Sequence, residues 1–317
     1  SFAAVRLMFG LGEGPIYPAA AIAVHKWFNK GEKGNASSFI LNGCFLGPVV
    51  GPAVTVALMA ALGWKAVFWL FGAVGVILAI IWYKFVPDDP SKSPYVNERE
   101  LEHINDGRVA AAAEKKVAPW GRLLKSSQFW ALGLQFLITD YIMYVFLAWL
   151  PMYLMEVHGF SLAKMGIWAA APWLSLMAVV FLCGYFSDKA IAAGFSQNLV
   201  KTGTGAVGIL LCACTLFIAT NTSDPMMNVF WLSVALGSLG LTMSASWSSV
   251  ITMGGQFAGS VSGWMNFWGN VGGVLAPTVT AWIATTYGWQ AAMVATAVTG
   301  AAGAVAWLFV KPDKAIV

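Results

Sequence analysis

Apolar residues fall into nine long runs along the chain, and short polar stretches separate them. Each run is about 20 residues or longer, which is the length that an α-helix needs to cross a bilayer. Transmembrane β-strands are shorter and alternate between apolar and polar residues, whereas these runs do not alternate. The pattern therefore predicts nine transmembrane helices. Their expected ranges are 2–24, 37–61, 65–86, 127–155, 163–186, 200–220, 228–251, 257–285 and 289–310.

Residues 87–126 differ from the rest of the chain because they are charged and interrupted by prolines. Such a segment stays in water, and it separates the first three predicted helices from the last six. We therefore predict an all-α polytopic membrane protein with three parts. These are a three-helix unit at residues 1–86, a linker at 87–126 and a six-helix bundle at 127–317.

The composition also indicates a membrane protein. Of the 317 residues, 59% are apolar and 10% are charged, whereas soluble domains contain about 25% charged residues. The basic residues form no stripe interleaved with aromatic residues, which argues against nucleic-acid binding. The three histidines and four cysteines show no metal-ligand spacing. We therefore expect neither a metal nor a cofactor.

The placement of basic residues predicts the orientation of the chain. If the linker is cytoplasmic, only Lys65 and Lys164 lie in segments on the opposite side, which agrees with the positive-inside rule. We therefore expect a cell-membrane protein of the bacterial inner-membrane type, with the linker and the C-terminus in the cytoplasm. The fifteen basic residues on the cytoplasmic side are Lys26, Lys30, Lys33, Lys84, Lys92, Arg99, Arg108, Lys115, Lys116, Arg122, Lys125, Lys189, Lys201, Lys311 and Lys314.

The first predicted helix carries two charged residues, Arg6 and Glu13. A charge at the bilayer centre costs at least about 2.5–3.5 kcal/mol, so such residues usually face a cavity or a partner. Seven residues make almost two helical turns, so Arg6, Glu13, Gly10 and Tyr17 share one face. A guanidinium group suits a carboxylate ligand, and a carboxyl group in a low-dielectric site can carry a proton.

We therefore predict that Arg6 binds an anionic substrate and that Glu13 couples transport to protons. Two other interpretations fit the same pattern. Arg6 and Glu13 could form a structural ion pair, or Arg6 could lie close to the membrane surface.

The fourth predicted helix contains Asp140, Tyr141 and Tyr144. Asp140 and Tyr144 lie four residues apart and therefore share a face. Tyrosine hydroxyls hydrogen-bond polar ligands. We predict that Tyr141 and Tyr144 bind substrate and that Asp140 is a second protonation site. Packing against neighbouring helices is the alternative for the two tyrosines.

The eighth predicted helix has small and polar residues at intervals of three and four positions, which places them on one face. Glycines at such intervals permit close contact between helices. We predict that Asn266 contacts substrate and that Asn270 bonds a neighbouring helix. The whole stripe is Gly259, Gly263, Asn266, Asn270, Gly273 and Pro277.

Glycine and proline also recur in the second predicted helix, at Gly43, Gly47 and Pro48. Small residues let helices approach, and proline bends them. We therefore predict a role in packing or gating for these three residues and no ligand contact.

These segments resemble the anion:cation symporter family of the major facilitator superfamily, and the similarity covers essentially the whole chain. Arg6-Leu-Met-Phe-Gly-Leu-Gly-Glu13-Gly-Pro15-Ile-Tyr-Pro18 is similar to that family's fourth helix. Tyr141-x-x-Tyr144 followed by Trp149-Leu150-Pro151 resembles its seventh helix. Gly184-Tyr-Phe-Ser-Asp188-Lys189 resembles the loop motif between helices eight and nine. Gly263-x-x-Asn266-x-x-Gly269-Asn270 is similar to the eleventh helix.

The resemblance implies a major facilitator fold of twelve helices in two six-helix bundles. The nine helices predicted here would then be helices four to twelve, and residues 1–86 would be the remainder of the N-terminal bundle in an N-terminally truncated chain. The resemblance also implies that Arg6 holds a substrate carboxylate, that Glu13 couples protons and that Asn266 contacts the ligand. Asp188 would belong to a gating or packing motif.

Two positions depart from the family pattern. Asp140 stands where relatives often have Asn, and Cys44 stands where several sugar-acid transporters have Gln. The anion implied by the resemblance is therefore a sugar acid or another carboxylate.

We thus predict a monomeric secondary active transporter that carries a small organic anion with a proton by alternating access. A proton-driven antiporter or efflux carrier of the same superfamily is the alternative, suggested by Gly47-Pro48. A membrane-embedded enzyme would need a catalytic constellation such as paired histidines. Because the sequence shows none, we expect no enzymatic activity.

Overall fold

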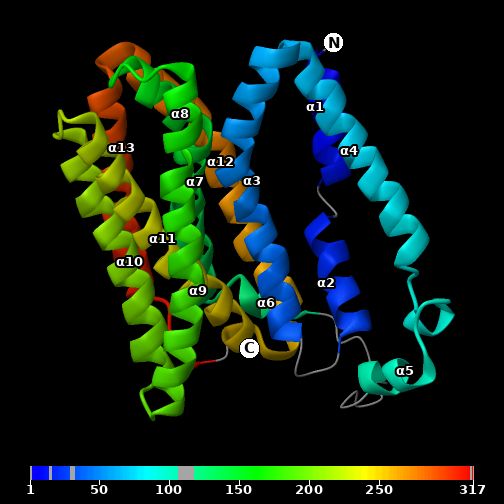
Figure 1. The fold of residues 1–317 in the computed structure, drawn as a ribbon. Coiled ribbons are helices and arrows are strands. Elements are labelled where there is room, and N and C mark those ends of the chain that lie inside the picture. The colour runs from blue at the N-terminus through cyan, green and yellow to red at the C-terminus, as the bar shows by residue number, and fades with distance from the viewer. Residues whose placement is uncertain (1, 14–15, 29–32, 106–117, 315, 317) are drawn as a thin grey trace. The chain divides into compact units, whose positions relative to one another are not determined.

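The computed structural model describes residues 2–13, 16–28, 33–105, 118–314 and 316. Within these ranges all regular elements are helices, and none is a strand (Figure 1). The helices are α1 Phe2–Glu13, α2 Ile16–Trp27, α3 Lys33–Leu62, α4 Trp64–Phe85, α5 Glu98–Asn105, α6 Trp120–Leu123, α7 Ser127–Glu156, α8 Leu162–Trp168, α9 Ala170–Ala192, α10 Gln197–Thr220, α11 Pro225–Gly254, α12 Ala258–Tyr287 and α13 Trp289–Trp307. Two short 3₁₀ turns, η1 Pro90–Lys92 and η2 Gly255–Phe257, complete the described elements.

Seven described segments are long and apolar enough to cross a membrane, which confirms the prediction of a polytopic helical membrane protein. They are Asn42–Leu62, Trp64–Phe85, Ser127–Glu156, Leu162–Ala192, Gln197–Thr220, Pro225–Gly254 and Trp289–Trp307. The helix predicted at 257–285 forms as α12 but is not among the seven, because its glycines, asparagines and threonines reduce its hydropathy. The helix predicted at 2–24 corresponds to α1 and α2, and residues 14–15 between them lie outside the described residues.

The chain divides into two compact units. The first contains Ser1–Cys44 and Leu58–Lys116, and the second contains Phe45–Ala57 and Val117–Val317. The middle of α3 groups with the second unit, where the Phe45 side chain is buried in the core. The three-part division predicted from the sequence stays a prediction.

In the first unit, α4 exposes almost every side chain that it carries. Two contacts hold the segment that follows α4. The Trp27 indole N–H, at the end of α2, donates a hydrogen bond to the Pro87 carbonyl at 3.3 Å. The rings of Phe85 and Tyr95 lie 5.1 Å apart.

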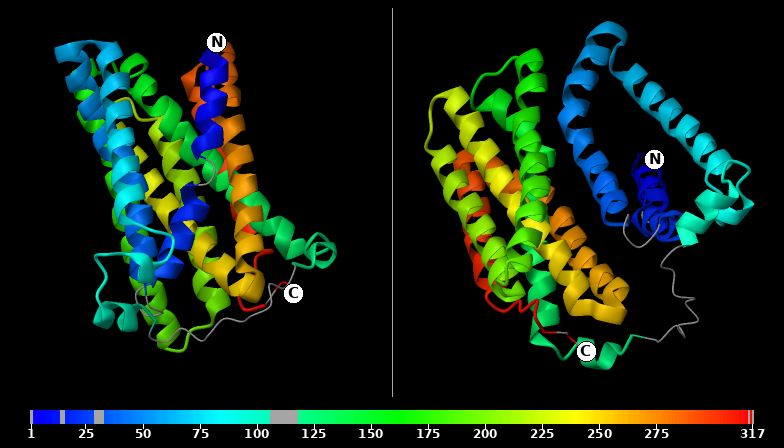
Figure 2. Two further views of the ribbon diagram at one scale, coloured as in Figure 1. Left: turned by 90° about the vertical axis from the view of Figure 1, so that its right-hand side faces the viewer. Right: turned by 60° about the horizontal axis from the view of Figure 1, so that its bottom comes forward.

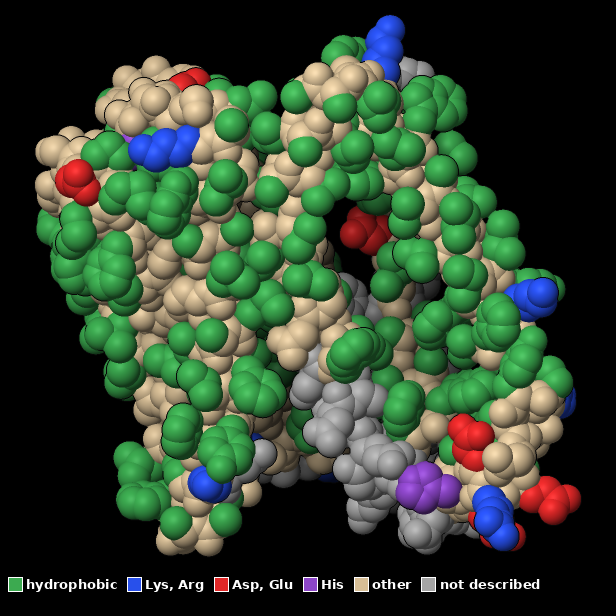
Figure 3. Space-filling view, in the orientation of Figure 1, with side chains coloured by type: hydrophobic (Ala, Val, Ile, Leu, Met, Phe, Trp, Pro, Cys, Tyr) green, Lys and Arg blue, Asp and Glu red, His purple; other side chains and the backbone are tan. Residues whose placement is uncertain are grey.

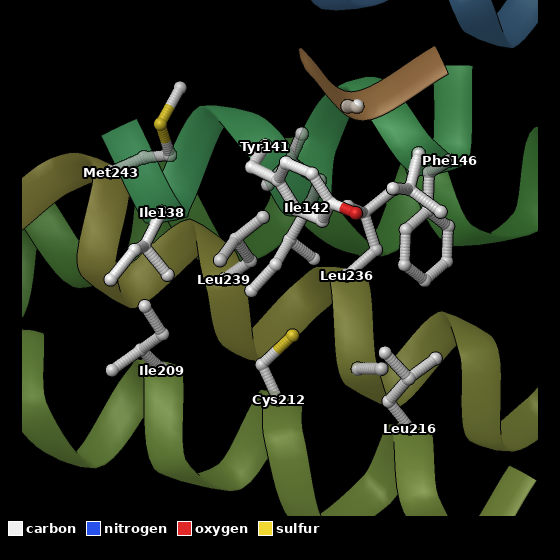
Figure 4. Close-up of a cluster of buried hydrophobic side chains, with 14 of the residues drawn as sticks. Ile138, Tyr141, Ile142, Phe146, Ile209, Cys212, Leu216, Leu236, Leu239 and Met243 are labelled. Carbon is white, nitrogen blue, oxygen red and sulfur yellow. The ribbon is translucent and has the colours of Figure 1, made fainter. Parts of the chain in front are cut away.

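The core of the second unit is built around α7, which packs against α11, α12 and α13. Figure 2 shows the long helices of this unit side by side from two further directions. Aliphatic side chains fill the space between α7, α10 and α11 (Figure 4). The labelled residues of this cluster include Ile138, Ile142, Ile209, Cys212, Leu216, Leu236, Leu239 and Met243.

Lipid tails are as apolar as these side chains, so close packing and interhelical hydrogen bonds must hold the bundle together. The Ser246 hydroxyl of α11 donates to Oε1 of Gln135 on α7 at 3.1 Å. The Thr242 hydroxyl donates to the Gly205 carbonyl of α10 at 3.0 Å. Gln135, Thr242 and Ser246 are all fully buried, so these bonds join three helices in the interior.

Figure 3 shows where charged side chains lie on one face of the molecule. On the second unit, hydrophobic side chains cover the middle of the helices in this view, and the charged side chains lie near their ends. This distribution fits a bundle whose middle faces hydrocarbon and whose ends face water.

α7 and α12 approach each other closely in the second unit. A Cβ atom at Gly272 would collide with the Leu137 carbonyl oxygen, and one at Gly273 would lie 2.8 Å from the Tyr144 ring. Because the first of these neighbours is backbone, α12 can lie this close to α7 only with glycine at position 272.

We predict that Gly272→Ala lowers the melting temperature of the purified protein, because the two helices must separate to admit the methyl group. Overpacking of this kind costs about 1–3 kcal/mol. Gly263→Ala on the same helix is the matched control, since no atom lies within 4 Å of its Cβ position. The control should keep or slightly raise the melting temperature, because alanine favours helix by up to about 1 kcal/mol. Equal melting temperatures for both variants would contradict the assigned contact.

Candidate functional site

The charged residues of the first predicted helix lie on α1, in the first unit. Arg6 and Glu13 both have exposed side chains. Their spacing of seven residues puts them on one face of α1, two turns apart. The side chain of Tyr17, the last member of the predicted stripe, lies outside the described residues.

Asp140 is the buried acidic residue of the described part of the second unit. Its side chain is only 6% exposed, and it lies in α7 at the contact with α12. One carboxyl oxygen, Oδ2, packs against Gly269 of α12. The other, Oδ1, is buried and has no hydrogen-bond partner among the described residues. An ionised carboxyl group in this environment would be a buried, unpaired charge, which is energetically costly. Such a residue is therefore a candidate for a functional role.

The two tyrosines predicted to bind substrate also face α12. Tyr141 is 8% exposed, and its hydroxyl lies 3.5 Å from the Thr280 hydroxyl. Tyr144 is half-buried, with its ring against Gly273. The structure therefore brings Asp140, Tyr141 and Tyr144 together along one helix contact.

The polar stripe of α12 does not pack as one contact surface. Gly259, Gly263 and Asn270 are exposed, and Asn266 is half-buried. The predicted bond from Asn270 to a neighbouring helix is wrong, because its amide donates to the Asn266 carbonyl of the same helix at 2.8 Å.

The glycines of α12 that pack tightly on α7 are Gly269, Gly272 and Gly273. Of these three, only Gly273 belongs to the stripe that the sequence pattern suggested, although the Pro277 carbonyl of the stripe also accepts a hydrogen bond from the Trp149 indole of α7 at 3.2 Å. The face of α12 that contacts α7 is therefore offset from the predicted stripe by about one residue, which corresponds to about 100° around the helix. The exposed asparagine face and the glycine contact face are neighbours on α12.

The residues predicted to act in packing or gating are less closely surrounded. Gly43 and Gly47 are exposed, and Pro48 is half-buried. The part of α3 that contacts α8 comes later, where Val56 lies 3.2 Å from the Cβ position of Gly166. Asp188 lies on α9, and its side chain is outside the described part of the chain.

Metal chemistry has no candidate site in the described ranges. No group of three or more His, Cys, Asp or Glu side chains there could hold a metal ion.

Comparison with known proteins identifies the family. Residues 1–277 match the sequence profile of the Major Facilitator Superfamily, which is most of the chain. The chain belongs to the major facilitator superfamily. Relatives in this superfamily are named as transporters of sulfoacetate and galactonate.

Several curated members of the superfamily are similar in sequence. The probable sulfoacetate transporter of Cupriavidus necator is 31% identical over 316 residues, which cover 97% of this chain and 72% of the relative. The D-galactonate transporter of Escherichia coli is 27% identical over 99% of this chain and 74% of the relative. The chloroplastic ascorbate transporter of Arabidopsis thaliana is 28% identical over 90% of this chain. The chain spans about half the length of that relative, 53%.

A solved structure supports the fold. A bacterial homologue of the human lysosomal transporter Spinster aligns with a TM-score of 0.73 over 93% of this chain and 74% of the other. At 17% identity this likeness concerns the fold alone.

A second polar group of this superfamily member lies at the far end of α7, and sequence analysis did not find it. The Tyr153 hydroxyl accepts a hydrogen bond from the Asn228 amide of α11 at 3.1 Å and lies 3.4 Å from Nε2 of His158. Tyr153 and Asn228 are almost fully buried. Burial lowers the pKa of His158 below its usual 6.5, and the negative charge of Asp224 opposes that shift.

We predict that the protein loses thermal stability as the pH falls through 6.5 toward the lower pKa of folded His158. Within this window the unfolded chain binds the proton more readily than the folded chain, so the stability contributed by neutral His158 is complete above the window and is lost as the pH falls through it. His158→Gln should flatten this part of the profile of melting temperature against pH. Asp224→Asn keeps an N-cap for α11 and should extend the decline to lower pH. An unchanged slope in His158→Gln would assign the decline to other groups.

Proposed function

We propose that the protein is a secondary active transporter that carries a small organic anion together with protons. The observation that carries the proposal is the pair Arg6 and Glu13 on one face of α1, in a chain whose relatives are named as transporters of sulfoacetate, galactonate and other anions. Charged residues inside a membrane are costly, so an arginine and a glutamate on one face of a helix usually face a polar cavity or pair with each other.

Arg6 is the proposed grip for the substrate carboxylate. Its planar guanidinium offers two parallel hydrogen bonds to a carboxylate, which also fixes the orientation of the ligand. On the second unit, Tyr141, Tyr144 and Asn266 are the proposed polar contacts for the remainder of the substrate. They are uncharged, so the carboxylate should depend on Arg6 for its counter-charge.

Glu13 is the proposed coupling residue, and Asp140 is the proposed second protonation site. The burial of Asp140 supports this second role. A buried carboxylate without a hydrogen-bond partner is costly because its charge has been removed from water, and taking up a proton removes that charge. A proton taken up at either acid would change the local charge that the anion meets. Coupling of anion and proton transport follows from that electrostatic link.

Alternating access is the proposed transport cycle, in which two helix bundles rock about a substrate site near the middle of the membrane. Gly43, Gly47, Pro48 and Asp188 are proposed to serve packing and gating in this motion. We further propose a monomer in a cell membrane, with the segment at 87–126 and the C-terminus in the cytoplasm. The excess of basic residues in the segments assigned to that side supports the orientation.

Uptake assays with Arg6 variants test the anion. The full-length protein is reconstituted in liposomes with an inward proton gradient and offered a panel of labelled carboxylates and sulfonates. One acid should accumulate, and Arg6→Ala should reduce its uptake about 10- to 150-fold, as expected for loss of a hydrogen bond to a charged group. Arg6→Lys should recover part of the affinity but not the bidentate geometry.

Lys164→Ala, on the opposite side of the predicted membrane from the linker, is the matched control and should leave uptake unchanged. Normal accumulation in Arg6→Ala would refute the assigned grip. Outward transport of lipophilic compounds, without uptake of any acid, would replace the symporter with a proton-driven efflux carrier.

Counterflow separates binding from coupling. Glu13→Gln should retain exchange of labelled for unlabelled substrate and lose accumulation driven by the proton gradient, because a neutral side chain at position 13 no longer binds or releases a proton. Asp140→Asn should behave in the same way if the second site is also obligatory. Proton-driven accumulation that survives in Glu13→Gln would exclude Glu13 as the coupling residue.

A further inference from the structure

The segment that leads into α7 forms a rigid turn on the second unit. Backbone bonds run from the Arg122 amide to the Pro119 carbonyl at 2.8 Å and from the Leu124 amide to the Trp120 carbonyl at 2.9 Å. Leu123 is fully buried and anchors the turn in the core. The indole N–H of Trp130, one turn into α7, donates to the Leu124 carbonyl at 2.8 Å and closes the turn from the other side.

An aromatic cluster lies beside this turn, formed by α6, α7 and α12. The rings of Phe129 and Trp264 stack at 4.7 Å, and Trp130 meets Trp264 edge-on at 4.9 Å. The Trp264 indole N–H donates to the Phe129 carbonyl at 3.0 Å, which fixes the ring. We call four of these side chains the aromatic shelf: Trp120, Trp130, Trp264 and Phe267.

Much of the aromatic shelf is open to its surroundings. Trp120 and Trp130 are each 45% exposed, and Phe267 is 56% exposed. Tryptophan is enriched where a membrane meets water, because its ring is apolar and its N–H is polar. α7 begins at Ser127, directly after the turn, so the shelf stands where this membrane-spanning helix starts.

Two cations stand on the same turn, Arg122 and Lys125, and both are exposed. No Asp or Glu occurs from Ala118 to Thr139, and α12 carries no charged residue. Neither cation forms an ion pair with a described residue. The turn, the first half of α7 and the whole of α12 therefore present positive charge and carry no carboxylate to balance it.

We propose that the turn and the aromatic shelf bind the head group of an anionic phospholipid. Arg122 and Lys125 would contact the phosphate, and the shelf would cover the first carbons of the acyl chains. Charge complementarity selects an anionic lipid over a zwitterionic one, and the exposed aromatic rings select a lipid over a soluble phosphate. The bound lipid would hold the rigid turn, and hence the start of α7, at the membrane surface.

Basic residues elsewhere at the chain's predicted cytoplasmic side provide a matched comparison. Lys311 and Lys314 are exposed and follow the last helix, but Asp313 lies between them and no aromatic shelf is assigned there. A diffuse attraction between basic side chains and an anionic membrane would treat the two pairs alike. A built lipid site would depend on Arg122 and Lys125 alone.

Native mass spectrometry of the full-length protein tests the site. The protein is released from nanodiscs that contain equal amounts of phosphatidylglycerol and phosphatidylcholine, and the retained lipids are counted. The wild type should retain phosphatidylglycerol with a preference of about tenfold, and R122Q/K125Q should lose that preference. K311Q/K314Q removes the same amount of charge and should keep the preference for phosphatidylglycerol.

Trp120→Ala tests the shelf without changing charge, and it should weaken retention of phosphatidylglycerol about threefold through lost apolar contact. An equal loss in both double variants would overturn the site in favour of diffuse attraction, and so would full retention in R122Q/K125Q. Displacement of the lipid by millimolar inorganic phosphate would contradict the lipid assignment and indicate a site for a free anion. The melting temperature of each variant checks that a loss of lipid does not result from unfolding.

Discussion

Backbone contact between α7 and α12 is the constraint on which the second unit depends. In lipid, two helices gain little by hiding apolar side chains from a solvent that is equally apolar, so they associate through close packing and hydrogen bonds. Gly272 lets α12 approach the Leu137 carbonyl of α7, and Gly273 makes room for the Tyr144 ring. The same contact encloses the carboxyl group of Asp140 and leaves the neighbouring face of α12, with Asn266 and Asn270, more open.

The two units differ in the polar groups that they carry. The first unit presents an arginine and a glutamate on the exposed face of α1, whereas the second presents uncharged polar groups and one buried acid. The proposed separation of the anion grip from the second proton site follows from this difference.

The ends of the second unit are as specialised as its middle. At one end, the buried side chains of Tyr153 and Asn228 join α7 to α11, with half-buried His158 beside them. At the other, a rigid turn carries two cations beside exposed indole rings. Both lie where α7 leaves the bilayer, and there polar groups, water and lipid head groups are within reach. Between them, buried hydroxyls such as those of Thr242 and Ser246 bond inside the bundle, and the Asp140 carboxyl group is an exception.

The sequence by itself determined that the chain is a bundle of membrane-spanning helices and indicated its superfamily, because hydropathy and backbone hydrogen bonding act within each segment. It also identified Asp140, Tyr141 and Tyr144 as neighbours of one another. It misplaced the contact face of α12 and gave Asn270 the wrong partner, because glycine and asparagine lie on adjacent faces of that helix at similar spacing. It did not connect Tyr153 with Asn228 and His158, and it did not find the aromatic shelf. Only the tertiary structure decided these points, since which face of a helix meets which neighbour depends on the shapes of both surfaces and not on periodicity within either one.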